Sequence, residues 1–126
     1  MNMKILLALL LMTLTSCSGL LYYPTDYRYV DVQILKYQPQ EVFFHENKDK
    51  HERLMGWYFK GARKVKGAPR ALFVFFHGNG QNMSSHFSSL FWVLNEGYDF
   101  FIFDYPGYGG SWGKPTPKST AESGIM

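Results

Sequence analysis

Two short apolar runs, each followed at once by a glycine-rich turn, constrain this 126-residue chain more than any other feature. The first run is 71–76, and His77-Gly78-Asn79-Gly80 follows it. The second run is 98–103, and it leads into the glycine-rich loop 104–111. Continuous apolar runs are typical of buried parallel strands, and the crossover between such strands is usually a helix. The sequence therefore predicts a β-α-β unit whose two loops lie at the carboxyl ends of the strands, where ligands bind in open α/β sheets.

The segment between the two runs has the pattern of an amphipathic helix. Asn82 is suited to cap its start, and Gly97 is suited to end it. Trp92 and Val93 widen the apolar face. The residues at helical spacing, which we expect to face the sheet, are Met83, Phe87, Leu90, Phe91 and Leu94.

Further elements are expected on both sides of this unit. Residues 41–45 and 54–59 have the pattern of two strands joined by a polar turn. Residues 30–35 begin with alternation, which suggests a short strand. After the second loop, Pro115 and Pro117 exclude regular structure, and Ser119 is suited to cap a helix that starts at Thr120.

The two glycine-rich loops, in this order and at the ends of apolar strands, resemble the first half of an α/β-hydrolase. The resemblance covers about Gln40 to Met126 and is closest to the esterases, lipases and serine aminopeptidases. It implies an α/β fold, namely the N-terminal half of an α/β-hydrolase sheet with an antiparallel hairpin and then a β-α-β unit. The family's strand order 1-2-4-3-5 places strand five beside 71–76. Strand five, the nucleophile, the acid and the triad histidine would then lie beyond Met126, and the isolated chain is expected to be poorly soluble and inactive.

The resemblance also gives roles to the loop residues. His77, Gly78, Asn79 and Gly80 correspond to the oxyanion loop, in which the N–H of Asn79 or Gly80 would stabilise the negative charge on a reacting carbonyl oxygen. A strand-to-helix turn with no ligand is the alternative. The loop after strand four contributes Asp104, Gly107, Gly109 and Ser111, and we expect Asp104 to bond neighbouring N–H groups.

Several apparent catalytic residues do not fit their positions. His77 precedes any nucleophile, whereas the triad histidine of this fold comes last, so it is expected to brace its loop. Ser111 lies in Gly-Gly-Ser-Trp-Gly, which matches the pattern of a nucleophile elbow. No strand directly precedes Ser111, however, and prolines follow it, so no triad residue is assigned. No metal site is expected at His45 or His51, and no cofactor is expected, because the glycine turns match neither nucleotide-binding pattern.

The N-terminus has the features of an export signal. Lys4 precedes the apolar stretch 5–14, which is too short to cross a bilayer core of about 30 Å as a helix. Leu14-Thr15-Ser16-Cys17 resembles the lipobox of bacterial lipoproteins. That resemblance implies a signal peptide over 1–16, acylation of Cys17, and, with Ser18 following, an outer-membrane location facing the periplasm or cell surface. An ordinary cleaved signal or an uncleaved anchor is the alternative.

This organisation leaves residues 17–29 as a tether and 30–126 as a partial hydrolase domain. The formal net charge of +3 gives no reason to expect a nucleic-acid partner. The basic cluster Arg63, Lys64, Lys66 and Arg70 is expected to be a solvated loop, with a lipid-headgroup contact as the alternative.

Three functions stay open at this stage. The first is part of a membrane-anchored serine hydrolase, whose small ester or peptide substrate would bind only to a completed domain. The second is a non-catalytic lipoprotein that binds a partner. The third is hydrolysis through Ser111.

Overall fold

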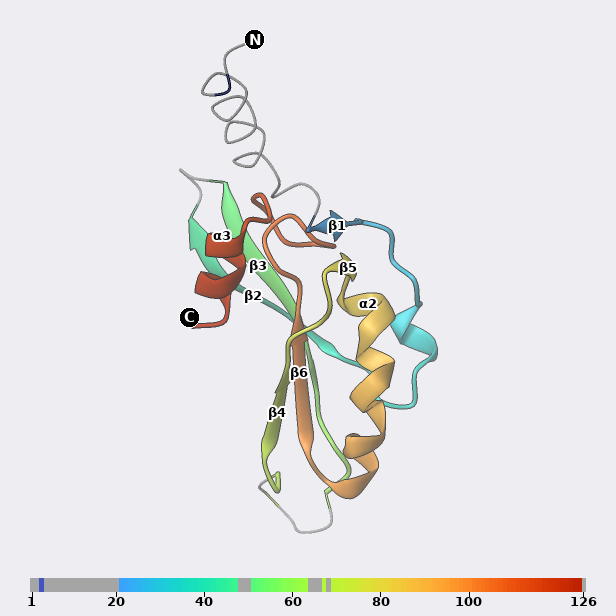
Figure 1. Ribbon diagram of the computed structural model, residues 1–126. Coiled ribbons are helices and arrows are strands. Elements are labelled where there is room, and N and C mark those ends of the chain that lie inside the picture. Colours follow the sequence, from blue (N-terminus) through green and yellow to red (C-terminus); the bar gives the residue numbers. More distant parts are fainter. Residues whose placement is uncertain (1–2, 4–20, 48–50, 64–66, 68, 126) are drawn as a thin grey trace.

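A four-stranded sheet forms the centre of the protein (Figure 1). The computed structural model describes residues 3, 21–47, 51–63, 67 and 69–125. The predicted signal peptide 1–16, Cys17, Lys64 and Lys66 therefore lie outside the described residues. The strands are β2 (Gln40–Asn47), β3 (Glu52–Phe59), β4 (Leu72–Phe75) and β6 (Asp99–Phe103), in the order β2-β3-β6-β4.

The sheet has the topology that the sequence predicts. β2 and β3 form an antiparallel hairpin, β3 is antiparallel to β6, and β4 is parallel to β6 with Leu72 opposite Asp99 and Phe75 opposite Ile102. The predicted α/β fold, with a hairpin followed by a β-α-β unit, is confirmed. The hairpin strands extend beyond the predicted 41–45 and 54–59, and the register shifts between Phe44 and Asn47.

The crossover is helical, but only its first turn is α-helix. α2 (Met83–His86) continues into the 3₁₀ helix η3 (Phe87–Glu96). The side chain of Asn82 accepts a hydrogen bond from Ser84 N–H at 3.0 Å, and Gly97 ends the helix with φ +85°. Both predicted caps are therefore confirmed. Trp92 differs from the prediction: it is 60% exposed and is not part of the core.

The helical crossover packs against one face of the two central strands. Aromatic rings dominate this core, and Phe59 stacks on Phe87 and on Phe100 at ring-centre distances of 5.9 and 5.7 Å. A second cluster lies at the carboxyl end of β6, where Phe103 packs with Tyr105 and Tyr108. The main buried core consists of Met55, Trp57, Phe59, Met83, Phe87, Val93, Leu94, Phe100 and Ile102.

Two local predictions were wrong. The segment 30–35 is not a strand, because it contains the 3₁₀ turn η2 (Val32–Ile34), in which the Asp31 side chain accepts a hydrogen bond from Gln33 N–H. The last helix, α3 (Pro117–Ser123), starts earlier than Thr120. Thr116 is its N-cap and Ser119 completes a capping box, while Pro117 occupies the first helical position, where its missing N–H has no cost.

The segment 21–29, predicted as part of a tether, is bonded to the domain. β1 (Tyr23–Pro24) pairs in parallel with β5 (Gly80–Gln81), so the chain lies directly on the loop after β4. Tyr29 N–H also donates to Ser84 Oγ at 3.0 Å. The described part of the predicted tether is therefore a packed segment of the domain.

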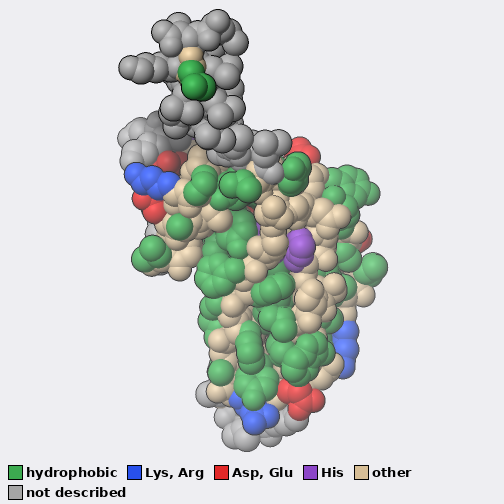
Figure 2. All heavy atoms as spheres, in the orientation of Figure 1, with side chains coloured by type: hydrophobic (Ala, Val, Ile, Leu, Met, Phe, Trp, Pro, Cys, Tyr) green, Lys and Arg blue, Asp and Glu red, His purple; other side chains and the backbone are tan. Residues whose placement is uncertain are grey.

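The outer edge of β4 pairs with no other strand among the described residues. Leu72, Phe73, Val74 and Phe76 have exposed fractions of 50, 40, 47 and 50%. Figure 2 shows hydrophobic side chains gathered over β4 on the viewed face. Although β4 has only four residues, an exposed apolar edge of this kind is a template for pairing with another chain.

We expect Val74→Lys to reduce self-association of the chain, because a charged side chain on an edge strand opposes edge-to-edge pairing. Light scattering at rising protein concentration measures the effect. Trp92→Lys, at an exposed apolar position on the helix η3 with an exposed fraction of 60%, is the matched control, and it should change scattering less because η3 is not a sheet edge. Equal scattering by the parent chain and Val74→Lys would show that the β4 edge does not drive association.

Candidate functional site

The two predicted loops meet at the carboxyl ends of β4 and β6. Because these strands are parallel neighbours, their following loops leave the sheet at the same edge. The hydroxyl of Tyr105 donates to His77 O at 2.9 Å, and that of Tyr108 donates to Asn79 O at 2.7 Å. Two tyrosines of the second loop therefore hold the backbone of the first.

The N-terminal segment fixes the first loop from its other side. Tyr23 N–H donates to Asn79 O at 2.9 Å, and Asn79 Nδ2 donates to Leu21 O at 2.8 Å. In this parallel pairing the backbone of Tyr23 bonds the residues before and after Gly80 and not Gly80 itself. The N–H and C=O of Gly80 therefore point away from β1. The carbonyl of Gly80 instead lies 2.9 Å from His86 Nε2.

A buried carboxylate connects these loops to the helix. Asp104 is 1% exposed, and its Oδ1 accepts a hydrogen bond from Met83 N–H at 2.7 Å. Its Oδ2 accepts a weaker bond from Gly110 N–H at 3.4 Å. Asp104 thus bonds neighbouring N–H groups, as the loop pattern suggests, while burial raises its pKa to about 6.

His77 lies against this carboxylate. Its Nδ1 is 2.7 Å from Gly78 O, which assigns the ring hydrogen to Nδ1. Its Nε2 is buried 3.5 Å from Asp104 Oδ1 without a hydrogen-bond partner among the described residues. Burial lowers the pKa of His77 to about 4, so the imidazole is neutral at pH 7 and the two groups do not form an ion pair there. A proton taken up by Asp104 below pH 6 would have Nε2 as its acceptor.

The hydroxyl of Ser111 is hydrogen-bonded to two backbone groups of the site. Ser111 is 7% exposed, its Oγ donates to Asp104 O at 2.7 Å, and it accepts a bond from Met55 N–H at 2.9 Å. It joins the loop after β6 to β3. No helix follows it directly, since α3 begins at Pro117. This geometry gives Ser111 a structural role.

The need for glycine differs between the two loops. Gly109 has φ +47°, and an added Cβ would lie 1.9 Å from Asp104 Oδ2. Gly107 has φ +82°, and its Cβ would lie 2.7 Å from Pro115 Cδ. Gly78 and Gly80 lie outside the left-handed region, and a Cβ at Gly80 would meet nothing within 4 Å. Within the described residues, the turn therefore does not depend on glycine there, and the left-handed residue of this loop is Gln81, with φ +62°.

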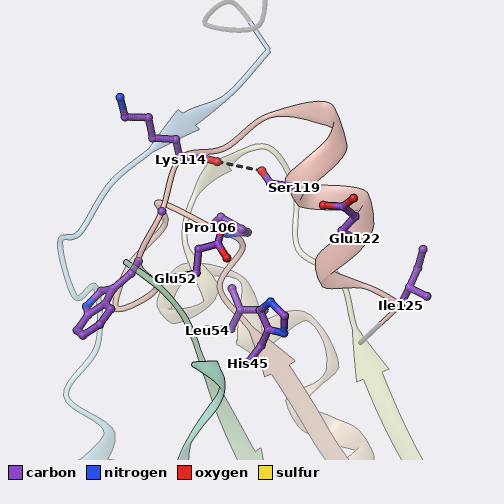
Figure 3. A pocket seen from close by; sticks show the side chains of 10 residues that line it. His45, Glu52, Leu54, Pro106, Lys114, Ser119, Glu122 and Ile125 are labelled. Carbon is purple, nitrogen blue, oxygen red and sulfur yellow. Dashed lines mark hydrogen bonds between the residues drawn. The ribbon is translucent and has the colours of Figure 1, made fainter. Parts of the chain in front are cut away.

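Two cavities lie near this edge, and neither is lined by residues 77–80. The larger, of about 410 Å³, lies between the end of the β2–β3 hairpin and α3 (Figure 3). The smaller, of about 150 Å³, includes Asp104, Arg28 and Asn82 in its wall. The larger one is lined by His45, Glu52, Leu54, Pro106, Trp112, Gly113, Lys114, Ser119, Glu122 and Ile125.

In the part of the chain that the structure describes, no group of three His, Cys, Asp or Glu side chains could hold a metal ion. Over the same residues, no helix has the length and apolar character needed to cross a membrane.

No protein-family model matches the chain. It is similar to YfhR, an uncharacterized protein of Escherichia coli K12, with 34% identity over 64 residues that cover 51% of this chain and 22% of that protein. The YfhR of Salmonella typhimurium is 34% identical over 65 residues, which cover 52% and 22%. The chain thus matches about a fifth of the length of these curated relatives.

Among solved structures, the chain is similar to the esterase Pf2001 of Pyrococcus furiosus. In one crystal form the TM-score is 0.57 at 20% identity, covering 82% of this chain and 40% of the esterase. In a second form it is 0.53 at 20% identity, covering 75% and 34%. At this identity the similarity shows the fold alone. The described residues therefore have an α/β-hydrolase-like fold over a part of the esterase's length.

We expect Gly109→Ala to destabilise the protein and Gly80→Ala to leave its stability nearly unchanged. The first combines a left-handed backbone with overlap onto Asp104, which together cost roughly 2 kcal/mol or more. The second adds a methyl group to open space. Urea unfolding of both variants measures the difference, and equal losses would contradict this account of the loop.

The Asp104–His77 pair predicts a pH dependence. The stability that Asp104 gains from its raised pKa is present below pH 3.8 and is lost as pH rises through about 6. The contribution of His77, whose pKa is lowered, is present above pH 6.5 and is lost as pH falls through about 4. The two trends oppose each other in the parent chain.

Asp104→Asn removes the first contribution and leaves the second. We therefore expect its midpoint of urea unfolding to fall more steeply than that of the parent between pH 6.5 and 4. His77→Asn keeps Asp104 and should show the opposite change of slope. Parallel pH profiles of the parent and both variants would contradict the assignment.

Proposed function

We propose that this chain forms the oxyanion-loop part of a membrane-anchored serine hydrolase that acts on ester or amide bonds. The observation that carries the proposal is the position of loop 77–81 at the tips of β4 and β6, where the Tyr105 and Tyr108 hydroxyls hold it. The esterase-like fold supports the same class of reaction.

The proposed role of this loop is electrostatic. When a serine attacks a carbonyl carbon, negative charge develops on the carbonyl oxygen, and preorganised N–H donors stabilise it. In our proposal the N–H of Asn79 or Gly80 supplies one donor. The two bonds accepted by Asn79 O support this role, since they restrain the peptide plane that also carries the N–H of Gly80.

His77, Asp104 and Ser111 are positioning residues in this proposal. Asp104 and Ser111 connect the loop after β6 to the helix and to β3, and His77, in the first loop, lies against Asp104. The nucleophile, the acid and the triad base are not assigned to any residue of these 126. The chain by itself is therefore proposed to be inactive, and a small ester or peptide would be the substrate of a completed domain.

We further propose that Cys17 is acylated after removal of residues 1–16, which would anchor the protein to the outer membrane. Several acyl chains on one cysteine give stable anchoring, because each buried CH₂ contributes about 0.8 kcal/mol. Neither a cofactor nor a nucleic acid is part of this proposal.

A non-catalytic binding module is the second candidate. The open edge of β4 favours it, since a partner could add a strand there through backbone hydrogen bonds. This candidate requires a stable complex that Val74→Lys weakens, with no hydrolysis. The first candidate requires no such complex.

We expect the chain to hydrolyse short p-nitrophenyl esters no faster than its Ser111→Ala variant, because the Ser111 hydroxyl is buried and bonded to backbone groups. Release of p-nitrophenol measures the rates. Activity in the parent chain that disappears in Ser111→Ala would instead support hydrolysis through Ser111.

The nucleotide sequence after codon 126 tests the main proposal directly. A strand followed by Gly-x-Ser-x-Gly, encoded within a few dozen codons in any frame, would supply the nucleophile elbow. Its absence would remove the serine-hydrolase proposal and leave the binding module.

A further inference from the structure

We propose that the side chains of Leu21, Tyr23, Tyr27 and Tyr29, here called the tyrosine surface, lie on the lipid bilayer. The candidate site would then be held at the membrane surface. This inference rests on the proposed membrane anchoring but not on hydrolase activity.

The length of chain before Leu21 limits how far this surface can be from the membrane. Three residues lie between Cys17 and Leu21, which makes four residue-to-residue steps, and six lie between Leu14, the end of the apolar stretch, and Leu21, which makes seven steps. A fully extended chain spans at most about 3.6 Å per residue, so the two reaches are at most about 14 and 25 Å. Either anchor, an acylated Cys17 or an inserted apolar stretch, would therefore keep Leu21 within this distance of the bilayer.

The segment is hydrogen-bonded to the domain from Leu21 onward, so no free length of chain follows the short connection. Asn79 Nδ2 donates to Leu21 O at 2.8 Å, and β1 pairs with β5 immediately afterwards. Further along, Asn82 Nδ2 donates to both Thr25 O and Tyr27 O, at 2.8 and 2.9 Å. The restraint on Leu21 is thus transmitted to the loops of the candidate site.

The side chains of this segment divide into an inner and an outer set. Tyr22 is half-buried and packs against the cluster of Phe103, Tyr105 and Tyr108. The tyrosine surface is directed outward, with exposed fractions of 55% for Leu21, 60% for Tyr23, 66% for Tyr27 and 43% for Tyr29. The backbone of this segment binds the domain, which leaves these side chains available for another contact.

The chemistry of the outer set fits a lipid interface. Tyrosine has an apolar ring and a polar tip, and it is enriched where hydrocarbon meets headgroups. The charges within the segment are few: Arg28 is paired with Glu41, and Asp26 is exposed. An uncharged contact of this kind predicts binding to zwitterionic as well as anionic lipid.

This orientation turns the basic loop away from the membrane. Arg63 binds Asp99, the first residue of β6, and Arg70 N–H donates to Gly97 O, so both lie at the amino ends of the parallel strands. β1 lies beside the loop at their carboxyl ends, at the opposite end of the sheet (Figure 1). The proposal therefore selects a solvated loop for the basic cluster over a lipid-headgroup contact.

Fluorescence quenching by brominated phosphatidylcholine tests the contact. The full chain and its Tyr27→Trp variant are reconstituted into vesicles of this lipid and into vesicles of the unbrominated lipid. The emission of the three native tryptophans is subtracted using the parent chain. We expect the emission of the introduced indole to shift to shorter wavelength and to lose most of its intensity in brominated vesicles.

Phe73→Trp is the matched control, because it places a tryptophan in the other exposed apolar surface, on the β4 edge. Its added emission should not be quenched. Quenching at position 73 but not at 27 would assign the membrane contact to the β4 edge and overturn the proposal.

Flotation of the chain with the same vesicles tests the membrane anchoring separately from the contact made by the tyrosine surface. If the chain floats with the vesicles and position 27 is not quenched, the tyrosine surface is wrong while anchoring stands. If the chain does not float, both the anchoring and the surface are wrong. Flotation that persists in 1 M NaCl, together with quenching at position 27, supports the proposal.

Discussion

The buried carboxylate of Asp104 is the constraint on which the carboxyl edge of this sheet depends. It lies at the end of β6, and its side chain accepts bonds from the first residue of α2 and from the loop after β6. Its backbone carbonyl receives the Ser111 hydroxyl, which in turn accepts a bond from β3. One residue therefore joins the helix and β3 to its own loop, and its nearly complete burial raises its pKa. The close approach of Gly109 follows from the same arrangement, because a side chain there would occupy the carboxylate's position.

The two glycine-rich loops have different physical roles around this residue. The loop after β6 is a rigid support, in which glycines are required by positive φ and by close packing. The loop after β4 rests on it through two tyrosine hydroxyls, and β1 holds it from the other side. This difference suits a site in which one loop is a scaffold and the other presents backbone groups. In our proposal, those groups face a reacting carbonyl.

Among the described residues, the β4 edge and the tyrosine surface are exposed apolar surfaces on different parts of the molecule. The β4 edge has backbone groups that can pair with a strand as well as apolar side chains, so its natural partner is another strand. The four residues that carry the tyrosine surface each have a backbone group bonded to the domain, and their side chains are directed outward. That distinction is why we connect the first surface with protein and the second with lipid.

The sequence predicted most of the fold because its signals were local and consistent. The apolar runs at 71–76 and 98–103, the stripe from Met83 to Leu94, and the caps at Asn82 and Gly97 correspond to observed elements. The pairing of β1 with β5 gave no such signal, since a two-residue strand that contains Pro24 has no periodicity. The early start of α3 was missed because Pro117 was taken as a helix breaker, whereas a proline is compatible with the first helical position.

The candidate site shows which features the sequence by itself predicts and which it does not. Residue order alone placed His77–Gly80 and Asp104–Ser111 at neighbouring strand ends, because hydrophobic periodicity determines which segments become buried strands. Only the tertiary structure decided that Tyr105 and Tyr108 hold the first loop, that His77 faces Asp104, and that residues 21–29 lie on both loops. These contacts join residues far apart in the chain through single hydrogen bonds. The partner of each hydrogen bond depends on how the packed elements lie in space, and a local sequence pattern does not predict this arrangement.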